Sequence, residues 1–209
     1  MNLTSLPLRL AARVFSRVIA RGEPGGVYLT FDDGPDPEIT PRVLDIFKEN
    51  DARATFFVTG SQVDRHPEIV RRIAAEGHSI GNHSYNHWSL IWAGNAQVQE
   101  EVTRANDAIR RALDDASLPL PLFRPPYGRI GFGMMRAARE LDLTVVLWSR
   151  LVGDWRPLDR GALVSRATEG VEPGEIIVLH DRGRYAAHIA ESLPEIAAVL
   201  KRRFQLRGL

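Results

Sequence analysis

Short apolar segments alternate with amphipathic helical segments along nearly the whole chain after residue 26. The pattern predicts strands at 27–31, 54–58, 78–81, 121–124, 144–149 and 175–180, with a further short one at 204–206. It predicts helices at 40–50, 63–76, 96–115, 133–141, 160–170 and 188–203. Repeated strand–helix alternation is typical of a parallel sheet covered by helices. About seven such units fit either a closed or nearly closed β/α barrel or an open doubly wound sheet, and the periodicity alone does not separate the two.

The composition excludes several classes of protein. The 209 residues contain no cysteine, so disulfide scaffolds, cysteine-ligated zinc modules, iron–sulfur clusters and thiol nucleophiles are ruled out. The length suits one domain with a sizeable core. A net charge of +1 provides no global basic field, so we expect no nucleic-acid partner. No apolar run reaches the length of about 18 residues that a transmembrane helix needs.

The first 22 residues differ from the rest in containing no acidic residue. Arginines recur there at every fourth position (Arg9, Arg13, Arg17 and Arg21), and apolar residues fill most of the remainder. This spacing predicts an amphipathic helix over 1–22, followed by the domain proper at 23–209. The arginines interrupt the apolar stretch that a secretory signal needs, so we expect a cytoplasmic protein. The helix either packs on the domain or, through residues 1–21, contacts an anionic membrane surface, and a targeting peptide is the remaining alternative.

Polar residues gather where the predicted strands end, which is where parallel α/β folds place their active sites. The first strand ends in Asp32 and Asp33, followed by Gly34 and Pro35. One carboxylate could bind a metal while the other acts as a base, and a plain Asp-Gly-Pro turn is the alternative. The third predicted strand precedes His83 and His87, whose spacing places both imidazoles on one face of a helical turn. Together the two pairs indicate a metal site made of two histidines and one aspartate, with a spare carboxylate, as in a hydrolase.

Three further strand ends carry candidate site residues. Arg124 is followed by two prolines and Tyr127, a rigid segment that could hold an N–H group toward a developing oxyanion. Asp154 precedes Trp155, a combination that sugar-binding clefts use, and a buried run ends at His180. Each of these taken alone also fits a structural role: a rigid loop, a solvated acid beside a core tryptophan, or a structural histidine.

These segments together resemble the five motifs of the NodB-homology polysaccharide deacetylases, which form carbohydrate esterase family four. The motifs occur in the family's order at 30–35, 83–87, 124–128, 154–155 and 179–180, and the resemblance covers roughly residues 27–206. It is greatest to the short members that deacetylate chitooligosaccharides. It implies an irregular (β/α)7-type barrel in a single domain.

The resemblance also implies a role for each metal ligand and proton carrier. Asp33, His83 and His87 would bind one divalent metal, most often Zn²⁺, with Co²⁺ or Ni²⁺ as the other options. Asp32 would be the general base, and Arg124 would orient it and stabilise its charge.

The remaining motif residues would act on the leaving group and the acetyl group. His180 would be the general acid, held in its charged form by Asp154, because a neighbouring carboxylate raises the pKa of an imidazole. The backbone N–H of Tyr127 would stabilise the oxyanion. Trp155 and Leu179 would line the pocket for the acetyl methyl group.

Two positions depart from the family pattern. Leu151 occupies a position that often carries a second acid, and Trp88 follows the second metal histidine in place of a small residue or proline. Neither change removes a metal ligand or a proton carrier, so both bear on specificity.

We therefore predict a metal-dependent hydrolase that removes N-acetyl groups from an amino sugar in an oligosaccharide, a polysaccharide or a glycoconjugate. The alternatives that keep the same site are an O-acetyl esterase and a cyclic-amide hydrolase. Two further hypotheses are weaker. A non-catalytic sugar-binding module would be expected to have lost a metal ligand or the base, and neither is lost. A phosphatase is disfavoured because no phosphate loop is present. The sequence does not fix the oligomeric state.

Overall fold

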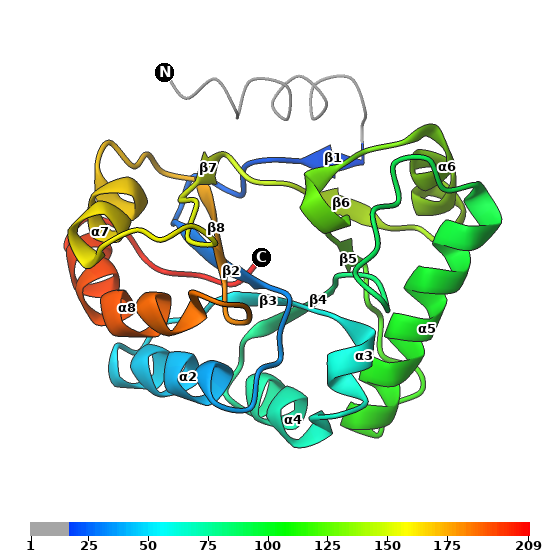
Figure 1. The fold of residues 1–209 in the computed structure, drawn as a ribbon, viewed down its shortest axis with the longest axis horizontal. Coiled ribbons are helices and arrows are strands. Elements are labelled where there is room, and N and C mark those ends of the chain that lie inside the picture. Colours follow the sequence, from blue (N-terminus) through cyan, green and yellow to red (C-terminus); the bar gives the residue numbers. More distant parts are fainter. Residues whose placement is uncertain (1–16) are drawn as a thin grey trace.

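The computed structural model describes residues 17–209, and its centre is one curved sheet of eight parallel strands (Figure 1). The order across the sheet is β1-β6-β5-β4-β3-β2-β8-β7. The strands are β1 (Val18–Ile19), β2 (Tyr28–Asp32), β3 (Thr55–Val58), β4 (Ser79–Asn82), β5 (Leu122–Phe123), β6 (Thr144–Val146), β7 (Arg150–Leu151) and β8 (Ile176–His180). Within the described residues the edge strands β1 and β7 are not paired with each other, and the curl of the sheet brings both to the same side of the molecule (Figure 1). The irregular β/α barrel expected from the resemblance is confirmed.

Helices cover the outside of this sheet (Figure 1). They are α2 (Ile39–Glu49), α3 (Gly60–Val63), α4 (Pro67–Ala75), α5 (Asn95–Leu113), α6 (Phe132–Glu140), α7 (Arg160–Thr168) and α8 (Ala186–Lys201). The amphipathic pattern of the longer helices sets the arrangement, because their apolar stripes face the sheet and most of their charged residues face solvent.

The central strands β2, β3 and β8 are mostly apolar because both of their faces are buried. All five residues of β2 are buried, as expected for a central parallel strand. The inner face packs a small cluster inside the barrel that includes Tyr28, Phe57 and Val178. The outer face packs a larger cluster against the helices.

The predicted elements agree with the structure within a few residues, with three exceptions. The helix expected over 63–76 is two helices, α3 and α4, because Pro67 starts a new helix after a turn at 64–66. The short strand β7 was not predicted. The strand expected at 204–206 is only an isolated bridge between Leu206 and Val27.

The helix predicted over 1–22 lies outside the described residues as far as residue 16, and its last part is wrong. Val18 and Ile19 form strand β1, which pairs with β6 and extends the sheet. Arg17 forms an ion pair of 2.7 Å with Asp142, and Arg21 binds Glu172 at 2.8 Å. The acids that neutralise these arginines are distant in sequence, so the local pattern did not show them. The folded domain therefore includes residues before position 23.

No helix among residues 17–209 combines the length and the apolar character needed to cross a membrane.

Candidate active site

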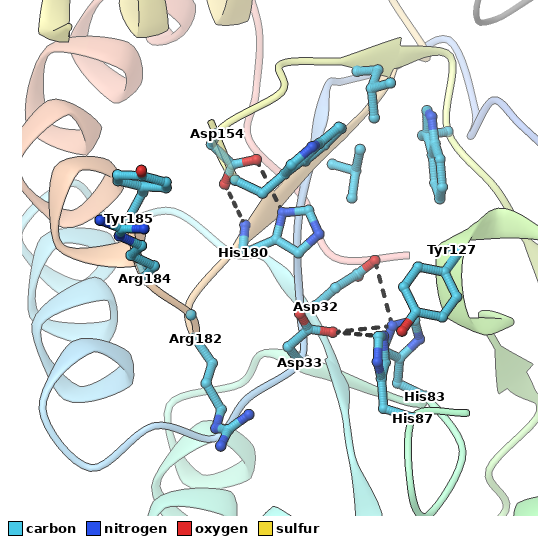
Figure 2. A pocket seen from close by; sticks show the side chains of 16 residues that line it. Asp32, Asp33, His83, His87, Tyr127, Asp154, His180, Arg182, Arg184 and Tyr185 are labelled. Atoms are coloured by element: carbon cyan, nitrogen blue, oxygen red, sulfur yellow. Dashed lines mark hydrogen bonds and ion pairs between the residues drawn. The ribbon is translucent and has the colours of Figure 1, made fainter. Parts of the chain in front are cut away.

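The predicted site residues meet at the carboxyl ends of the parallel strands. Asp32 ends β2, His83 follows β4, Arg124 follows β5 and His180 ends β8. A cavity of about 520 Å³ opens at this edge, a size typical of sites for small ligands (Figure 2). Its wall includes the predicted Asp32, Asp33, His83, His87, Tyr127, Asp154, Trp155 and His180, together with Trp148, Leu151, Val178 and the 182–186 segment.

Asp33, His83 and His87 form a cluster that could hold one metal ion. Asp33 Oδ1 lies 3.0 Å from His87 Nε2 and 3.4 Å from His83 Nε2 (Figure 2). Burial raises the pKa of Asp33, but the two imidazoles lower it by more and hold it well below its usual range. The carboxylate is therefore charged at any working pH.

The donor set fits a divalent cation. His83 Nδ1 lies 2.7 Å from the carbonyl oxygen of Arg124, so the ring donates its Nδ1 proton there. Its Nε2 then presents a lone pair toward Asp33 Oδ1, a buried oxygen without a hydrogen-bond donor. Two acceptors facing each other at this distance repel, and a cation between them converts that repulsion into coordination.

The segment that carries the two histidines is a loop, so the helical turn predicted for them is wrong. Ser84 and His87 have positive φ angles of 63° and 59°, which no α-helix contains. Ser84 Oγ accepts the His87 N–H at 3.0 Å, and Asn82 Oδ1 accepts the Ser84 N–H at 2.7 Å. These bonds bring the imidazole centroids to 5.0 Å from each other without a helix.

Glu101, a residue that the sequence analysis missed, holds the same loop from helix α5. Its carboxylate accepts the N–H groups of Tyr85 and Asn86 at 3.1 and 2.9 Å and the Asn86 side-chain amide at 2.6 Å. Glu101 is buried on the same helix face as Val98 and Val102. A charged residue within the apolar stripe of a helix was the signal that could have found it.

Asp32 is held by the most deeply buried charge in the domain, Arg124. The guanidinium is fully buried and donates to Asp32 Oδ1 and Thr30 Oγ1, both at 2.7 Å. Its remaining N–H groups donate to the carbonyls of Val146 and Leu147. Burial lowers the pKa of Arg124, and the Asp32 charge opposes that shift. This fixed cation orients the Asp32 carboxylate, whose Oδ2 lies 3.9 Å from His83 Nε2.

His180 and Asp154 lie across the cavity from His83 and His87 (Figure 2), and His180 is the neighbour of Asp32 on the paired strands β2 and β8. Asp154 accepts two hydrogen bonds from His180, one from the backbone N–H at 2.7 Å and one from Nδ1 at 3.0 Å. Burial lowers the pKa of His180, but Asp154, together with the charges of Asp32 and Asp33, raises it to about 9. The imidazolium is thus a proton donor at neutral pH.

Of the three residues predicted to contact the substrate, Tyr127 and Trp155 line the cavity and Leu179 does not. The Trp155 ring packs edge-on against His180 with centroids 5.5 Å apart, and Tyr127 packs against His87 at 4.8 Å. The prediction for Leu179 is wrong: its side chain is buried in the outer core, and Val178 lines the cavity in its place. Successive side chains of a strand alternate between faces, so with His180 facing the cavity Leu179 must face the helices.

The two departures from the family pattern also lie in different places. Leu151 lines the cavity wall, whereas Trp88 is 58% exposed and lies outside that wall.

Asp181, next to His180, was also missed and supports the turn after β2. Its side chain is buried, accepts a 2.6 Å hydrogen bond from Thr40 Oγ1, and has a pKa raised to about 7 by burial. A Cβ atom on Gly34 would lie 2.5 Å from this carboxylate, so the turn that carries Asp32 and Asp33 requires glycine there.

Comparison with known proteins identifies the family. The profile described as polysaccharide deacetylase matches residues 20–146. The chain belongs to the polysaccharide deacetylase family. It is 39% identical to a chitooligosaccharide deacetylase of Sinorhizobium fredii, over 80% of this chain and 78% of that protein. A solved peptidoglycan N-acetylglucosamine deacetylase superposes with a TM-score of 0.88 at 30% identity, over 96% of this chain and 94% of the other.

Members of the polysaccharide deacetylase family are metal-dependent enzymes, yet one solved relative is a pseudoenzyme. That protein, from Bacillus anthracis, superposes with a TM-score of 0.83 at 25% identity, over 92% of this chain and 67% of its own. The fold alone therefore does not establish catalytic activity, which depends on the side chains in the cavity.

Proposed function

We propose that this protein is a metal-dependent deacetylase that removes acetyl groups from N-acetylglucosamine residues of an oligosaccharide, a polysaccharide or a glycoconjugate. One observation carries the proposal. A cluster of two histidines and an aspartate lines the same cavity as a carboxylate oriented by a buried arginine, Asp32, and a histidine held protonated, His180. Amide hydrolysis needs these three elements: an electrophile, a base and an acid.

The base and the acid account for both proton transfers. Asp32 takes a proton from the attacking water as the new C–O bond forms at the acetamide carbonyl. His180 then gives its proton to the departing nitrogen as the C–N bond breaks, releasing acetate and the free amine. Arg124 orients Asp32 through a hydrogen bond, and Asp154 holds the acid in place. The backbone N–H of Tyr127, on the cavity wall, is the proposed donor to the oxyanion.

We propose Zn²⁺ as the metal, with Co²⁺ and Ni²⁺ as alternatives. Two imidazole nitrogens and one carboxylate oxygen are ligands that Zn²⁺ prefers and leave open positions for water and substrate. When bound, the cation polarises the acetamide carbonyl and lowers the pKa of water. Asp33, His83 and His87 are the residues that would hold it.

The acid favours an amide over the alternative substrates. An amine is a poor leaving group unless it is protonated, whereas an ester oxygen or an activated leaving group depends less on a proton. Asp154 is a buried carboxylate that keeps His180 charged. A permanently available acid of this kind supports N-deacetylation over O-acetyl ester cleavage. An open cavity with exposed aromatic side chains supports a saccharide over a small cyclic amide.

The test is hydrolysis measured by mass spectrometry on a substrate panel, as loss of acetyl from the acetylated saccharides and as addition of water to a cyclic amide. N-acetylglucosamine oligomers, acetylated xylan and a cyclic amide are each incubated with protein that has been stripped by a chelator and then given back Zn²⁺, Co²⁺ or Ni²⁺. We expect acetate from the N-acetylated oligomers with metal and none without it. Release from xylan alone would replace the proposal with an O-acetyl esterase, and release from no substrate would support a sugar-binding module.

The role of the N-terminal segment and the cytoplasmic location of the protein remain predictions. The ion pairs of Arg17 and Arg21 support packing of residues 17–22 on the barrel. Peripheral membrane contact through residues 1–21 is tested by co-sedimentation with anionic vesicles at low and high salt, since binding by basic residues weakens as salt rises.

A further inference from the structure

Helix α5 binds the loop 83–87, which carries both histidines of the proposed metal site, through one buried carboxylate. Glu101 Oε2 accepts the backbone N–H groups of Tyr85 and Asn86 at 3.1 and 2.9 Å. Its Oε1 accepts the side-chain amide of Asn86 at 2.6 Å. Glu101 is 3% exposed and is not part of the cavity wall. All three N–H donors belong to the loop, so the carboxylate acts on the loop and not on a substrate in the cavity.

The helix itself does not require a carboxylate at this position. Glu101 lies on the same buried face of α5 as Val98 and Val102, where an apolar residue would pack without losing hydration. No lysine or arginine among residues 17–209 forms an ion pair with it. The cost of burying a carboxylate is offset when several N–H groups bind it. The hydrogen bonds to the loop therefore account for the presence of an acid in the apolar face of α5.

A second contact fixes the start of the loop to the same helix. Asn82, the last residue of β4, donates its side-chain amide to the carbonyl oxygen of Val102 and to Asn106 Oδ1, both at 2.8 Å. Asn82 Oδ1 in turn accepts the Ser84 N–H at 2.7 Å. The loop is thus attached to α5 at its beginning through Asn82 and at its middle through Glu101.

These contacts hold a backbone that is unfavourable without them. Ser84 and His87 have φ angles of 63° and 59°, and such conformations are strained in residues other than glycine. His87 Nε2 lies 3.0 Å from Asp33 Oδ1 in this arrangement. A return of His87 to an ordinary φ would redirect its Cα–Cβ bond and move Nε2 away from the other ligand atoms. Glu101 therefore stabilises the ligating conformation of the loop against relaxed ones.

We propose that Glu101 is a positioning residue that sets the affinity of the site for its cation, by holding the loop 83–87 in the ligating conformation before the cation binds. The inference rests on the metal site of the proposed function. Apparent affinity is proportional to the fraction of the protein in which the ligands are already arranged, so a loop released from α5 binds the cation more weakly although no ligand is lost. Replacement of a residue that orients a metal ligand typically weakens metal binding by about 10- to 100-fold.

Four variants separate this role from a general contribution to folding. Glu101→Ala removes every bond from this side chain to the loop. Glu101→Gln keeps one oxygen for the backbone N–H groups but removes the charge that strengthens these bonds. Glu100→Gln removes the same charge from the neighbouring, exposed position of α5. Ile109→Ala weakens the buried core about two turns further along the same helix and so lowers stability alone.

The two measurements are the Kd for Zn²⁺, from competition with a fluorescent chelator, and hydrogen exchange of the Tyr85 and Asn86 amides in the metal-free protein. We expect the Kd to be about 10- to 100-fold higher in Glu101→Ala and to rise by less in Glu101→Gln. Exchange at both amides should be faster in these two variants, because the N–H groups lose their acceptor or bind it more weakly. Glu100→Gln and Ile109→Ala should keep the wild-type Kd.

A wild-type Kd in Glu101→Ala would overturn the inference, and so would an equal rise of the Kd in Ile109→Ala. If Glu101→Ala does not fold, Glu101→Gln is compared with Glu100→Gln: a higher Kd in Glu101→Gln supports the inference, and equal values overturn it. The proposed function fails in a different way. If the wild type itself binds no Zn²⁺, Co²⁺ or Ni²⁺, the metal site is removed, and the inference with it.

Discussion

The Asp154→Asn substitution tests the proton-donor role of His180 with little change in shape. Asp154 accepts two N–H groups from His180, and asparagine has a single oxygen to offer them. The neutral amide of the asparagine then lies beside His180 Nδ1 and no longer stabilises the positive charge of the imidazolium. The histidine stays as buried as before, so the factor that lowers its pKa is retained while the main factor that raises it is lost.

The expected size follows from the pKa of His180, which is about 9 against an ordinary value of 6.5. A fall to 6.5 or below is a change of about two and a half pH units, or about 3 kcal/mol. A metal at Asp33 would offset the pull of the neighbouring carboxylates but leave the contact with Asp154 unchanged. At pH 8 the protonated fraction falls about thirtyfold, whereas at pH 6 it falls less than about twofold.

The assay is kcat/KM between pH 5.5 and 9.5 on an N-acetylglucosamine tetramer. We expect the basic limb of the wild-type profile near pH 9 and that of the variant near or below pH 6.5. With 4-nitrophenyl acetate, whose leaving group needs no proton, this limb should be weak in both proteins. A basic limb at the same pH in wild type and variant would refute the assignment of His180 as an acid poised by Asp154.

The same contact makes a prediction about stability. A histidine whose pKa is raised on folding stabilises the native state fully below pH 6.5, and this contribution is lost as the pH rises through about 9. The difference in unfolding free energy between wild type and variant should therefore shrink over this range, by up to about 3 kcal/mol. Urea unfolding at pH 6 and pH 9.5 measures it, and a difference independent of pH would contradict the raised pKa.

Three further predictions concern single side chains. His83→Ala and His87→Ala should each lower bound metal, measured by elemental mass spectrometry after dialysis, and full occupancy in both would contradict the ligand assignment. Asp32→Asn should keep its metal yet lose about 10²–10⁴ in kcat, the usual contribution of a general base, and wild-type turnover would exclude that role. Leu179→Ala should lower the unfolding free energy by about 2–5 kcal/mol with KM little changed, because its side chain fills the core and not the cavity. A KM effect as large as that of Trp155→Ala would restore Leu179 to the pocket.

Sequence periodicity predicted the sheet and its helices because burial dictates both patterns. Buried strands such as β8 are apolar along most of their length, and helices such as α5 are amphipathic, so one rule recovers each element. The elements that escaped, β1, β7 and α3, have two to four residues and are too short to show a period. β1 and β7 contribute two residues each, and pairing with β6 and β8 defines them more than their composition does.

The chemistry of the site was predictable where it depends on residue type and position at a strand end, and not where it depends on distant contacts. Asp33, His83 and His87 come together because the parallel strands β2 and β4 end at one edge of the sheet. Glu101 and Asp181 hold the loops of the site from other elements, and no local pattern relates them to it. Leu179 was misassigned because it is adjacent to His180 in the motif, whereas adjacent side chains of a strand lie on opposite faces of the sheet.

The site is also where the backbone departs most from regular structure. Non-glycine residues with positive φ include Asp33 at 76°, Ser84 at 63°, His87 at 59° and Tyr127 at 61°, all within or beside the cavity loops. Such conformations cost about 1–3 kcal/mol each and persist where surrounding contacts over-determine them. Here the contacts are the hydrogen bonds that Ser84 Oγ and the Glu101 carboxylate accept from backbone N–H groups, and the close packing under the Asp33 turn. The rigid parallel sheet stabilises a strained set of loops, and the strain aims one carboxylate and two imidazoles at a common point. Sequence periodicity therefore predicts the sheet and its helices. It does not predict the conformation of the loops that carry the residues on which the proposed reaction depends.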